Sequence, residues 1–102
     1  MNLLKANSEA INSLCKKHKG EKLYAFGSVL TSAFHDESDV DFLVDFRDQG
    51  IEKYVSNFFE FKFELENLFK RDVDLIEASS ISNPYFKEEL EETKILIYES
   101  EN

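Results

Sequence analysis

The sequence predicts an α/β fold in which a small mixed sheet has helices packed on one face. Three observations carry this prediction: short apolar runs typical of strands, longer stretches with apolar residues at helical spacing, and an alternation of the two along the chain. With 102 residues the chain can bury one hydrophobic core but has no room for a second recognition domain. We therefore expect a single domain over residues 1–102.

The N-terminal half is predicted to begin with an amphipathic helix. Its apolar side is formed by residues at helical spacing, namely Leu4, Ile11, Leu14, Cys15 and His18. Gly20 follows a lysine-rich stretch and is expected just after the end of this helix, where glycine is favoured. The next elements are expected to be a strand over 22–26, a short helix over 28–33, a polar loop over 34–38 and a strand over 39–46.

The C-terminal half is predicted to contain a long helix and two further short elements. Gly50 separates the second strand from this helix, expected over 51–70, whose apolar residues form one broad face. A third strand is expected over 72–77. After a segment rich in serine, with an asparagine and the only proline, residues 85–92 are predicted to be helical and 95–98 to form a last strand or a helical turn.

Composition narrows the classes of partner. The chain has a formal net charge of −9 and only two arginines, Arg47 and Arg71, so it offers no basic stripe for a nucleic-acid backbone. We expect no nucleic-acid partner. No apolar run approaches the ~20 residues of a membrane span, and no signal peptide is recognisable, so we expect no membrane partner and a cytoplasmic location. The lone Cys15 lies on an apolar helical stripe and is expected in the core.

Five residues in three segments form the candidate site. Gly27 and Ser28 end an apolar strand, and glycine there lets backbone N–H groups approach a phosphate. Asp39 and Asp41 open the next strand and, because side chains alternate along a strand, lie on one face roughly 6–7 Å apart at Cα. Asp74 lies in a later strand-like run. Carboxylates suit divalent cations, so we expect a metal and phosphate centre.

Other residues near this pattern are expected to play no direct part. Asp45 shares the strand face of Asp39 but lies further from the glycine turn, and Asp72 is one strand period before Asp74, so both are predicted to be solvated or to support the site. His35 is expected to be exposed in its loop. A calcium-binding EF-hand is excluded because neither its glycine nor its closing glutamate falls at the required offset.

Over about residues 22–77 the pattern resembles the nucleotidyltransferase superfamily that includes DNA polymerase beta, and especially its minimal nucleotidyltransferases. The resemblance rests on an apolar strand, Gly-Ser, about ten residues, Asp-x-Asp on the next strand and a later Asp. It implies a polymerase beta-like palm fold, in which Asp39 and Asp41 bind two Mg²⁺ ions and Asp74 completes the metal site and acts as base. Gly27 and Ser28 would hold the nucleoside triphosphate. The chain departs from the family at Thr31, where most members carry arginine.

The resemblance also implies a function. Minimal nucleotidyltransferases are often paired with a small helical HEPN-type protein and act as the antitoxin of that pair. The expected activity is therefore Mg²⁺-dependent transfer of a nucleoside monophosphate, AMP from ATP, to a protein hydroxyl. The alternative is a catalytically degenerate module that acts by binding a partner protein. Phe59 and Phe63, which lie off the apolar face of the long helix, are expected either to contact that partner or to pack under the C-terminal segment.

Overall fold

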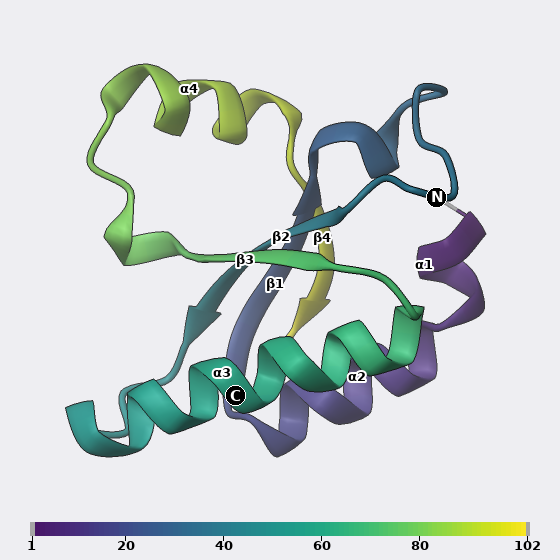
Figure 1. Ribbon diagram of the computed structural model, residues 1–102. Helices are drawn as coiled ribbons and strands as arrows, with labels where there is room; N and C mark the ends of the chain where they lie inside the picture. Colours follow the sequence, from purple (N-terminus) through teal and green to yellow (C-terminus); the bar gives the residue numbers. More distant parts are fainter. Residues whose placement is uncertain (1, 102) are drawn as a thin grey trace.

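The computed structural model describes residues 2–101 and contains a four-stranded mixed sheet with the strand order β3-β2-β1-β4 (Figure 1). The strands are β1 (Gly20–Phe26), β2 (Val40–Phe46), β3 (Val73–Glu77) and β4 (Ile95–Glu99). The helices are α1 (Asn2–Ala6), α2 (Ser8–Lys17), α3 (Ile51–Phe69) and α4 (Pro84–Thr93), with 3-10 turns η1 (Gly27–Leu30) and η2 (Ala78–Ser80). β1 is antiparallel to β2 and β4, whereas β2 and β3 are parallel and joined through α3. The predicted fold class is confirmed.

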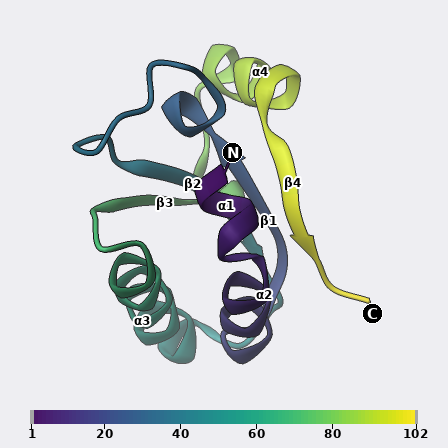
Figure 2. The same cartoon turned by 90° about the vertical axis from the view of Figure 1, so that its right-hand side faces the viewer.

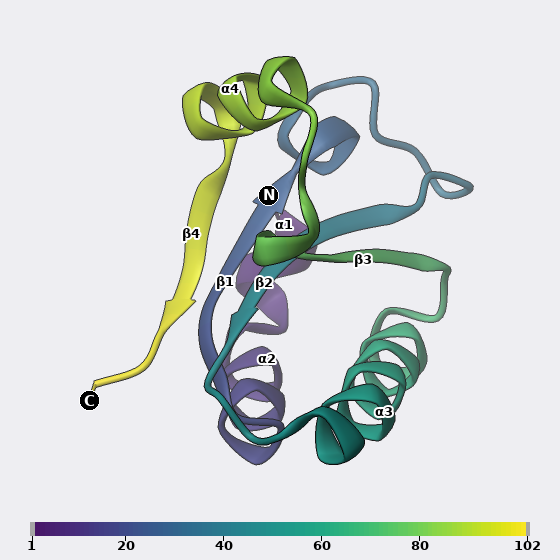
Figure 3. The same cartoon turned by 90° about the vertical axis from the view of Figure 1, so that its left-hand side faces the viewer.

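The two faces of the sheet have different characters. α2 and α3 lie together on one side of it in all three views, while α4 and η1 lie toward the opposite end (Figures 1, 2 and 3). The face toward α2 and α3 supplies the core. There the strand residues Leu23, Ala25, Phe42 and Val44 belong to one buried cluster with Phe61 and Leu65 of α3. Because side chains alternate along a strand, the residues between them point to the other face. We call that second face the carboxylate face, and its central residues are Tyr24, Asp41, Leu43, Asp74 and Ile76.

The N-terminal helix differs from the prediction in two places. The expected single helix is divided into α1 and α2 at Asn7, whose side-chain amide donates a hydrogen bond of 2.8 Å to the carbonyl of Leu3. This local hydrogen bond competes with continuation of the helix. Gly20 is the first residue of β1 rather than a residue ending the helix, and the left-handed residue is Lys19, with φ of 63°. A Cβ atom at Gly20 would lie 3.4 Å from the carbonyl oxygen of Cys15, an ordinary contact distance, so the available space does not require glycine at this position.

Two other boundaries were only partly predictable. The helix expected over 28–33 is the shorter turn η1, because Thr31 is extended and its hydroxyl donates to the carbonyl of Ser28 at 2.9 Å. The segment 95–98, left open between strand and helical turn, belongs to β4 and pairs with β1. Cys15 is fully buried, as expected. Of the predicted single domain over 1–102, residues 1 and 102 lie outside the described range.

α3 forms as predicted and carries both buried and exposed aromatic residues. It packs Phe61 against the sheet and ends where Lys70 adopts a left-handed conformation with φ of 58°. Phe59 and Phe63 are 50% and 55% exposed, so they are not covered by the C-terminal segment. In the part of the chain that the structure describes, no helix combines the length and apolar character needed to cross a membrane.

A polar cluster formed by Lys17, His18, Asn57 and Glu64 joins α2 to α3. We call this cluster the helix clamp. His18 is 3% exposed, and its two ring nitrogens lie 2.8 Å from Asn57 Oδ1 and 3.1 Å from Glu64 Oε2. Asn57 Nδ2 donates to the His18 carbonyl at 2.6 Å, which fixes the orientation of the amide. Lys17 Nζ contacts Glu64 Oε1 at 2.6 Å. The clamp therefore positions the two helices that cover the core.

Candidate active site

The turn after β1 brings the backbone against a carboxylate. Gly27 has φ of +75°, a conformation that side chains with a Cβ rarely adopt. A Cβ atom at this position would collide with Oδ2 of Asp41 and lie 3.3 Å from its Cγ. The backbone angle therefore favours glycine, and any side chain at this position would have to displace the Asp41 carboxylate. The predicted turn at Gly27 and the predicted carboxylate at Asp41 are direct neighbours.

Strand register places a second carboxylate beside the first. In the antiparallel pair β1 and β2, Phe26 lies opposite Asp41, and in the parallel pair β2 and β3, Asp41 lies opposite Asp74. Residues opposite one another on paired strands point to the same face. Phe26, Asp41 and Asp74 therefore form one row across the carboxylate face. Asp39 comes just before β2, one strand period from Asp41, and is exposed like Asp74.

Electrostatics shows that the three aspartates act on one another. Partial burial, followed by the neighbouring carboxylates of Asp74 and Asp39, raises the pKa of Asp41 above its ordinary value. Like charges at close range disfavour ionisation of the central group. The causes of this shift include no positively charged group that would offset it, so a positively charged ligand would relieve the repulsion.

The residues fit a hard divalent cation in their chemistry. All three candidate ligands are carboxylates, and Mg²⁺ prefers oxygen ligands. Among residues 2–101, however, no three side chains of His, Cys, Asp or Glu are gathered closely enough to form a ready metal centre. The structure thus brings Asp39, Asp41 and Asp74 into one electrostatic cluster without drawing their side chains around a single point.

The remaining predicted residues lie around this cluster. Ser28 is half-buried in η1, next to Gly27. Asp45 and Asp72 are exposed, as expected, and the carbonyl of Asp72 accepts a hydrogen bond of 3.2 Å from the Val40 N–H, which joins the beginnings of β3 and β2. His35 is exposed in the loop before Asp39, also as expected.

Sequence reasoning missed the side chain that holds this loop. Nη1 of Arg71 donates to the carbonyl oxygens of His35 and Ser38 at 3.1 and 2.9 Å. The guanidinium group also lies over the ring of Phe34, 4.6 Å from its centroid. Arg71 therefore anchors the segment that leads into Asp39. No spacing rule connects a residue before the third strand with a loop more than thirty positions earlier, so the sequence carried no signal for it.

A second missed residue brings a positive charge to the carboxylate face. Nζ of Lys94 lies 4.1 Å from the ring centroid of Tyr24 and 3.0 Å from Oε1 of Glu91. The Lys94 side chain is only 16% exposed. Its position was hidden in the sequence because acidic residues precede and follow it, a pattern typical of a solvated segment. The available signal was a single lysine directly before an apolar strand.

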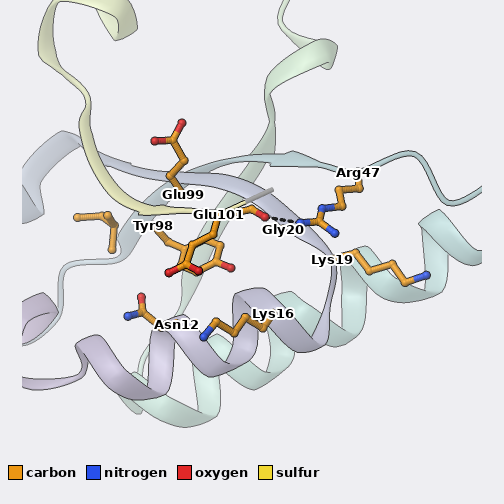
Figure 4. A pocket seen from close by; sticks show the side chains of 10 residues that line it. Asn12, Lys16, Lys19, Gly20, Arg47, Tyr98, Glu99 and Glu101 are labelled. Carbon is orange, nitrogen blue, oxygen red and sulfur yellow. Dashed lines mark hydrogen bonds between the residues drawn. The ribbon is translucent and has the colours of Figure 1, made fainter.

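A pocket lies away from the candidate site and has no residue in common with it. Its volume is about 510 Å³, and it is lined by parts of α2, the beginning of β1 and the end of β4 (Figure 4). Lys16, Lys19 and Arg47 contribute positive charge there, but Arg47 Nε donates to Glu21 Oε2 at 3.0 Å. Gly20 and Gly27 lie at opposite ends of β1, so this pocket is remote from Asp41.

Comparison with known proteins agrees with this geometry. Residues 9–102 match the model of the family described as "Polymerase beta, Nucleotidyltransferase". The protein of Methanocaldococcus jannaschii named "Putative protein adenylyltransferase MJ1379" is 35% identical over 81 residues, which cover 79% of this chain and 80% of that protein.

Two solved structures have the same fold. One, described as "Structure of putative minimal nucleotidyltransferase", is 29% identical, has a TM-score of 0.75 and covers 90% of both chains. The other contains tri-AMPylated Shewanella oneidensis HEPN toxin in complex with MNT antitoxin; the match is 21% identical, with a TM-score of 0.67, over 95% of this chain and 73% of the other. The chain belongs to the polymerase beta nucleotidyltransferase family, among its minimal nucleotidyltransferases.

Proposed function

We propose that this chain transfers AMP from ATP to a hydroxyl group of a partner protein, a small helical HEPN-type toxin, and so acts as its antitoxin. The observation that carries the proposal is the row of Asp41 and Asp74 beside the Gly27 turn. The name of the Methanocaldococcus jannaschii relative, a protein adenylyltransferase, supports the reaction. The matched complex with an AMPylated HEPN toxin supports the acceptor.

The phosphates of ATP are assigned to the turn after β1. The backbone N–H groups of Gly27 and Ser28 and the Ser28 hydroxyl donate to phosphate oxygens, because glycine leaves the backbone accessible at this point. Thr31 cannot supply the charge of the arginine that most family members have. Lys94 is the cation that we assign to the triphosphate, since its side chain reaches the carboxylate face at Tyr24.

Asp39 and Asp41 are assigned as the ligands of two Mg²⁺ ions, with Asp74 completing the set. These ions, when bound, would neutralise the triphosphate and favour ionisation of the acceptor hydroxyl. The raised pKa of Asp41 supports this assignment, because a cation removes the repulsion among the carboxylates that raises it.

Asp74 is assigned as the general base. It is exposed at the edge strand β3, where an acceptor protein can approach. Asp74 takes the proton of the acceptor hydroxyl, and the oxygen forms a bond to the α-phosphorus. The bond between the α-phosphorus and the bridging oxygen breaks, and pyrophosphate leaves with the electron pair. The product is a phosphodiester between AMP and the partner side chain.

Calorimetry of the purified chain with ATP and Mg²⁺ tests the site. We expect binding that requires Mg²⁺ and is lost in the double variant Asp39→Asn/Asp41→Asn. Intact-mass spectrometry of a HEPN-type protein encoded beside the chain, incubated with ATP, Mg²⁺ and the purified chain, then tests transfer. Binding that persists in the double variant, or an acceptor mass that never increases, would contradict the proposal.

A second candidate function rests on the exposed rings of Phe59 and Phe63 together with the missing arginine at Thr31. In this alternative the chain neutralises its partner by binding alone. Two double variants distinguish the candidates. Loss of toxin neutralisation in Asp39→Asn/Asp41→Asn, with complex formation retained, supports transfer. Loss only in Phe59→Ser/Phe63→Ser supports binding through α3.

A further inference from the structure

A pocket opens beside Gly27. It lies between the end of β1, η1 and α4 and has a volume of about 450 Å³. Volumes of about 300–1,000 Å³ are typical of sites for small organic ligands. α4 and η1 lie side by side at the same end of the molecule in all three views (Figures 1, 2 and 3). The pocket is therefore shaped in part by α4, a helix for which the proposed transfer has so far no use.

The walls of this pocket are mainly apolar and include two aromatic rings. Phe26 from β1 and Phe86 from α4 meet with ring centroids 6.3 Å apart and an interplanar angle of 73°. Leu30 and Leu90 add aliphatic surface. Such walls accept a flat aromatic ligand, because bases stack on aromatic side chains with little regard to sequence.

Register connects the pocket to the carboxylates. Phe26 lies opposite Asp41, so its ring and the Asp41 carboxylate emerge side by side on the same face. Gly27 itself lines the pocket while also contacting Asp41. A single ligand can therefore place a charged end at Asp41 and Ser28 and a flat end against Phe26 and Phe86.

One wall of the pocket is polar and indicates which flat ligand fits. Glu89 of α4 lines the pocket and is exposed, and a carboxylate accepts hydrogen bonds but donates none. Adenine, guanine and cytosine present exocyclic amino groups that can donate to it, whereas uracil offers there only a ring N3–H between two carbonyl oxygens, which a carboxylate repels. The pocket thus favours a base that carries an amino group.

We propose that the Phe26, Phe86 and Glu89 pocket binds the nucleobase of the donor nucleotide and selects a base with an exocyclic amino group. This inference rests on the proposed function, which supplies the nucleotide. The packing of α4 does not depend on Phe86 alone, because Leu90 is the buried residue of that helix. Substitution of Phe86 therefore probes the base without removing α4.

Calorimetry with two ligands separates the base from the phosphates. ATP and inorganic tripolyphosphate, each with Mg²⁺, are titrated into the wild-type chain, Phe86→Ala and the control Tyr85→Ala. Tyr85 is the neighbouring aromatic residue, is 83% exposed and does not line the pocket. We expect Phe86→Ala to weaken ATP binding about tenfold, as loss of one stacking contact would. Tripolyphosphate binding should stay unchanged in all three proteins, and ATP binding unchanged in Tyr85→Ala.

The outcomes distinguish this inference from the proposed function. If the wild-type chain binds neither ligand, the proposed function fails and the base pocket with it. If it binds tripolyphosphate as tightly as ATP, or if Phe86→Ala binds ATP like Tyr85→Ala, the phosphate site stands and the base pocket is refuted. An equal loss of both ligands in Phe86→Ala also refutes it. Should Phe86→Ala melt early by circular dichroism, Phe86→Leu keeps the apolar packing and removes only the ring.

Selectivity gives a second readout. Wild-type chain should bind ATP more tightly than UTP, and Glu89→Gln should reduce this preference, because a glutamine amide can also donate to the uracil carbonyl oxygen. An ATP to UTP ratio that is unchanged in Glu89→Gln would show that this carboxylate does not select the base.

Discussion

Two clusters of charged side chains lie on opposite sides of the sheet. The pKa of one carboxylate in each cluster is shifted, and the two shifts have opposite directions. In the helix clamp, hydrogen bonds from Lys17 and His18 lower the pKa of Glu64. On the carboxylate face, partial burial and the charges of Asp74 and Asp39 raise the pKa of Asp41. One carboxylate has its cations supplied by the protein, whereas the other has neighbours of its own sign.

The difference separates residues that hold the fold from residues that await a ligand. Glu64 and His18 are each other's polar partners in the folded chain, so an added ion would not stabilise the clamp further. The charges of Asp74 and Asp39 destabilise the ionised form of Asp41, and only a bound cation or a proton relieves this repulsion. In a chain with a net charge of −9, the positions of the lysines and arginines relative to the carboxylates are thus more informative than the number of acidic residues.

The first prediction removes the central charge of the carboxylate face. Asp41→Asn should lower AMP transfer by about a thousandfold or more, because an amide is a poor ligand for Mg²⁺ and the transition state loses its charge stabilisation. The fold should remain, since Asp41 is not part of the core. Radiolabelled transfer assays and thermal melts measure the two effects. Asp45→Asn, on the same strand and face but exposed, should retain activity; equal losses in both variants would show a general charge effect instead.

The second prediction tests the close approach of the turn to Asp41. Gly27→Ala should reduce transfer about a hundredfold, because the new Cβ displaces the Asp41 carboxylate. The positive φ adds a cost of about 1 kcal/mol to folding.

Gly50→Ala is the matched control for this variant. Gly50 has φ of +82°, but a Cβ there would meet no atom within 4 Å. Urea denaturation should show a similar loss of stability in both variants, and transfer should fall only in Gly27→Ala. Full activity in Gly27→Ala would mean that the turn does not position the carboxylate.

These two regions also differ in how far the sequence predicted them. At the candidate site, local patterns predicted Gly27, Asp39, Asp41 and Asp74. Strand alternation and a glycine at a turn both involve residues that are adjacent in the sequence, so they can be recognised there. In the structure Asp41 lies opposite Asp74 and next to Gly27, and Asp39 is one strand period before Asp41. Their roles in binding and catalysis stay predictions.

The helix clamp could not be predicted. His18 was placed on an apolar stripe by its spacing, and nothing local connects it with Asn57 or Glu64 on α3. The same holds for Arg71 and the loop before Asp39. The boundaries that were missed have a similar cause: Asn7 and Thr31 interrupt helices through their own side-chain hydrogen bonds, which periodicity does not register.

The third prediction weakens the clamp. Glu64→Gln should lower the free energy of unfolding by about 1 kcal/mol, because the charge-assisted hydrogen bonds to Lys17 and His18 are lost while one neutral acceptor remains. Transfer should be unaffected at temperatures well below the melting point. Glu60→Gln, an exposed residue one turn earlier on α3, should change neither quantity. A clamp variant that loses activity without losing stability would break the separation of the two regions.

The fourth and smallest effect is a pair of opposite pH dependences, measured by chemical denaturation with EDTA present. The pKa of Glu64 is lowered by folding, so its contribution to stability is present above the unfolded pKa and is lost as pH falls. The pKa of Asp41 is raised by folding, so the folded state binds its proton more tightly, and stability falls as pH rises above 3.8. Because Asp41 is only partly buried, solvent screening keeps this change small.

Asp41→Asn should therefore be more stable than wild type near about pH 6, and this advantage should shrink as pH falls toward the unfolded pKa of an aspartate. Glu64→Gln should be less stable than wild type near neutral pH, and its deficit should shrink on acidification. The two stability differences thus have opposite signs at neutral pH and converge at low pH. Adding Mg²⁺ should then stabilise the wild type but not Asp41→Asn, since relief of the repulsion requires the carboxylate. Differences of the same sign would mean that Asp41 is neutralised within the protein, and the carboxylate face would lose its distinction from the clamp.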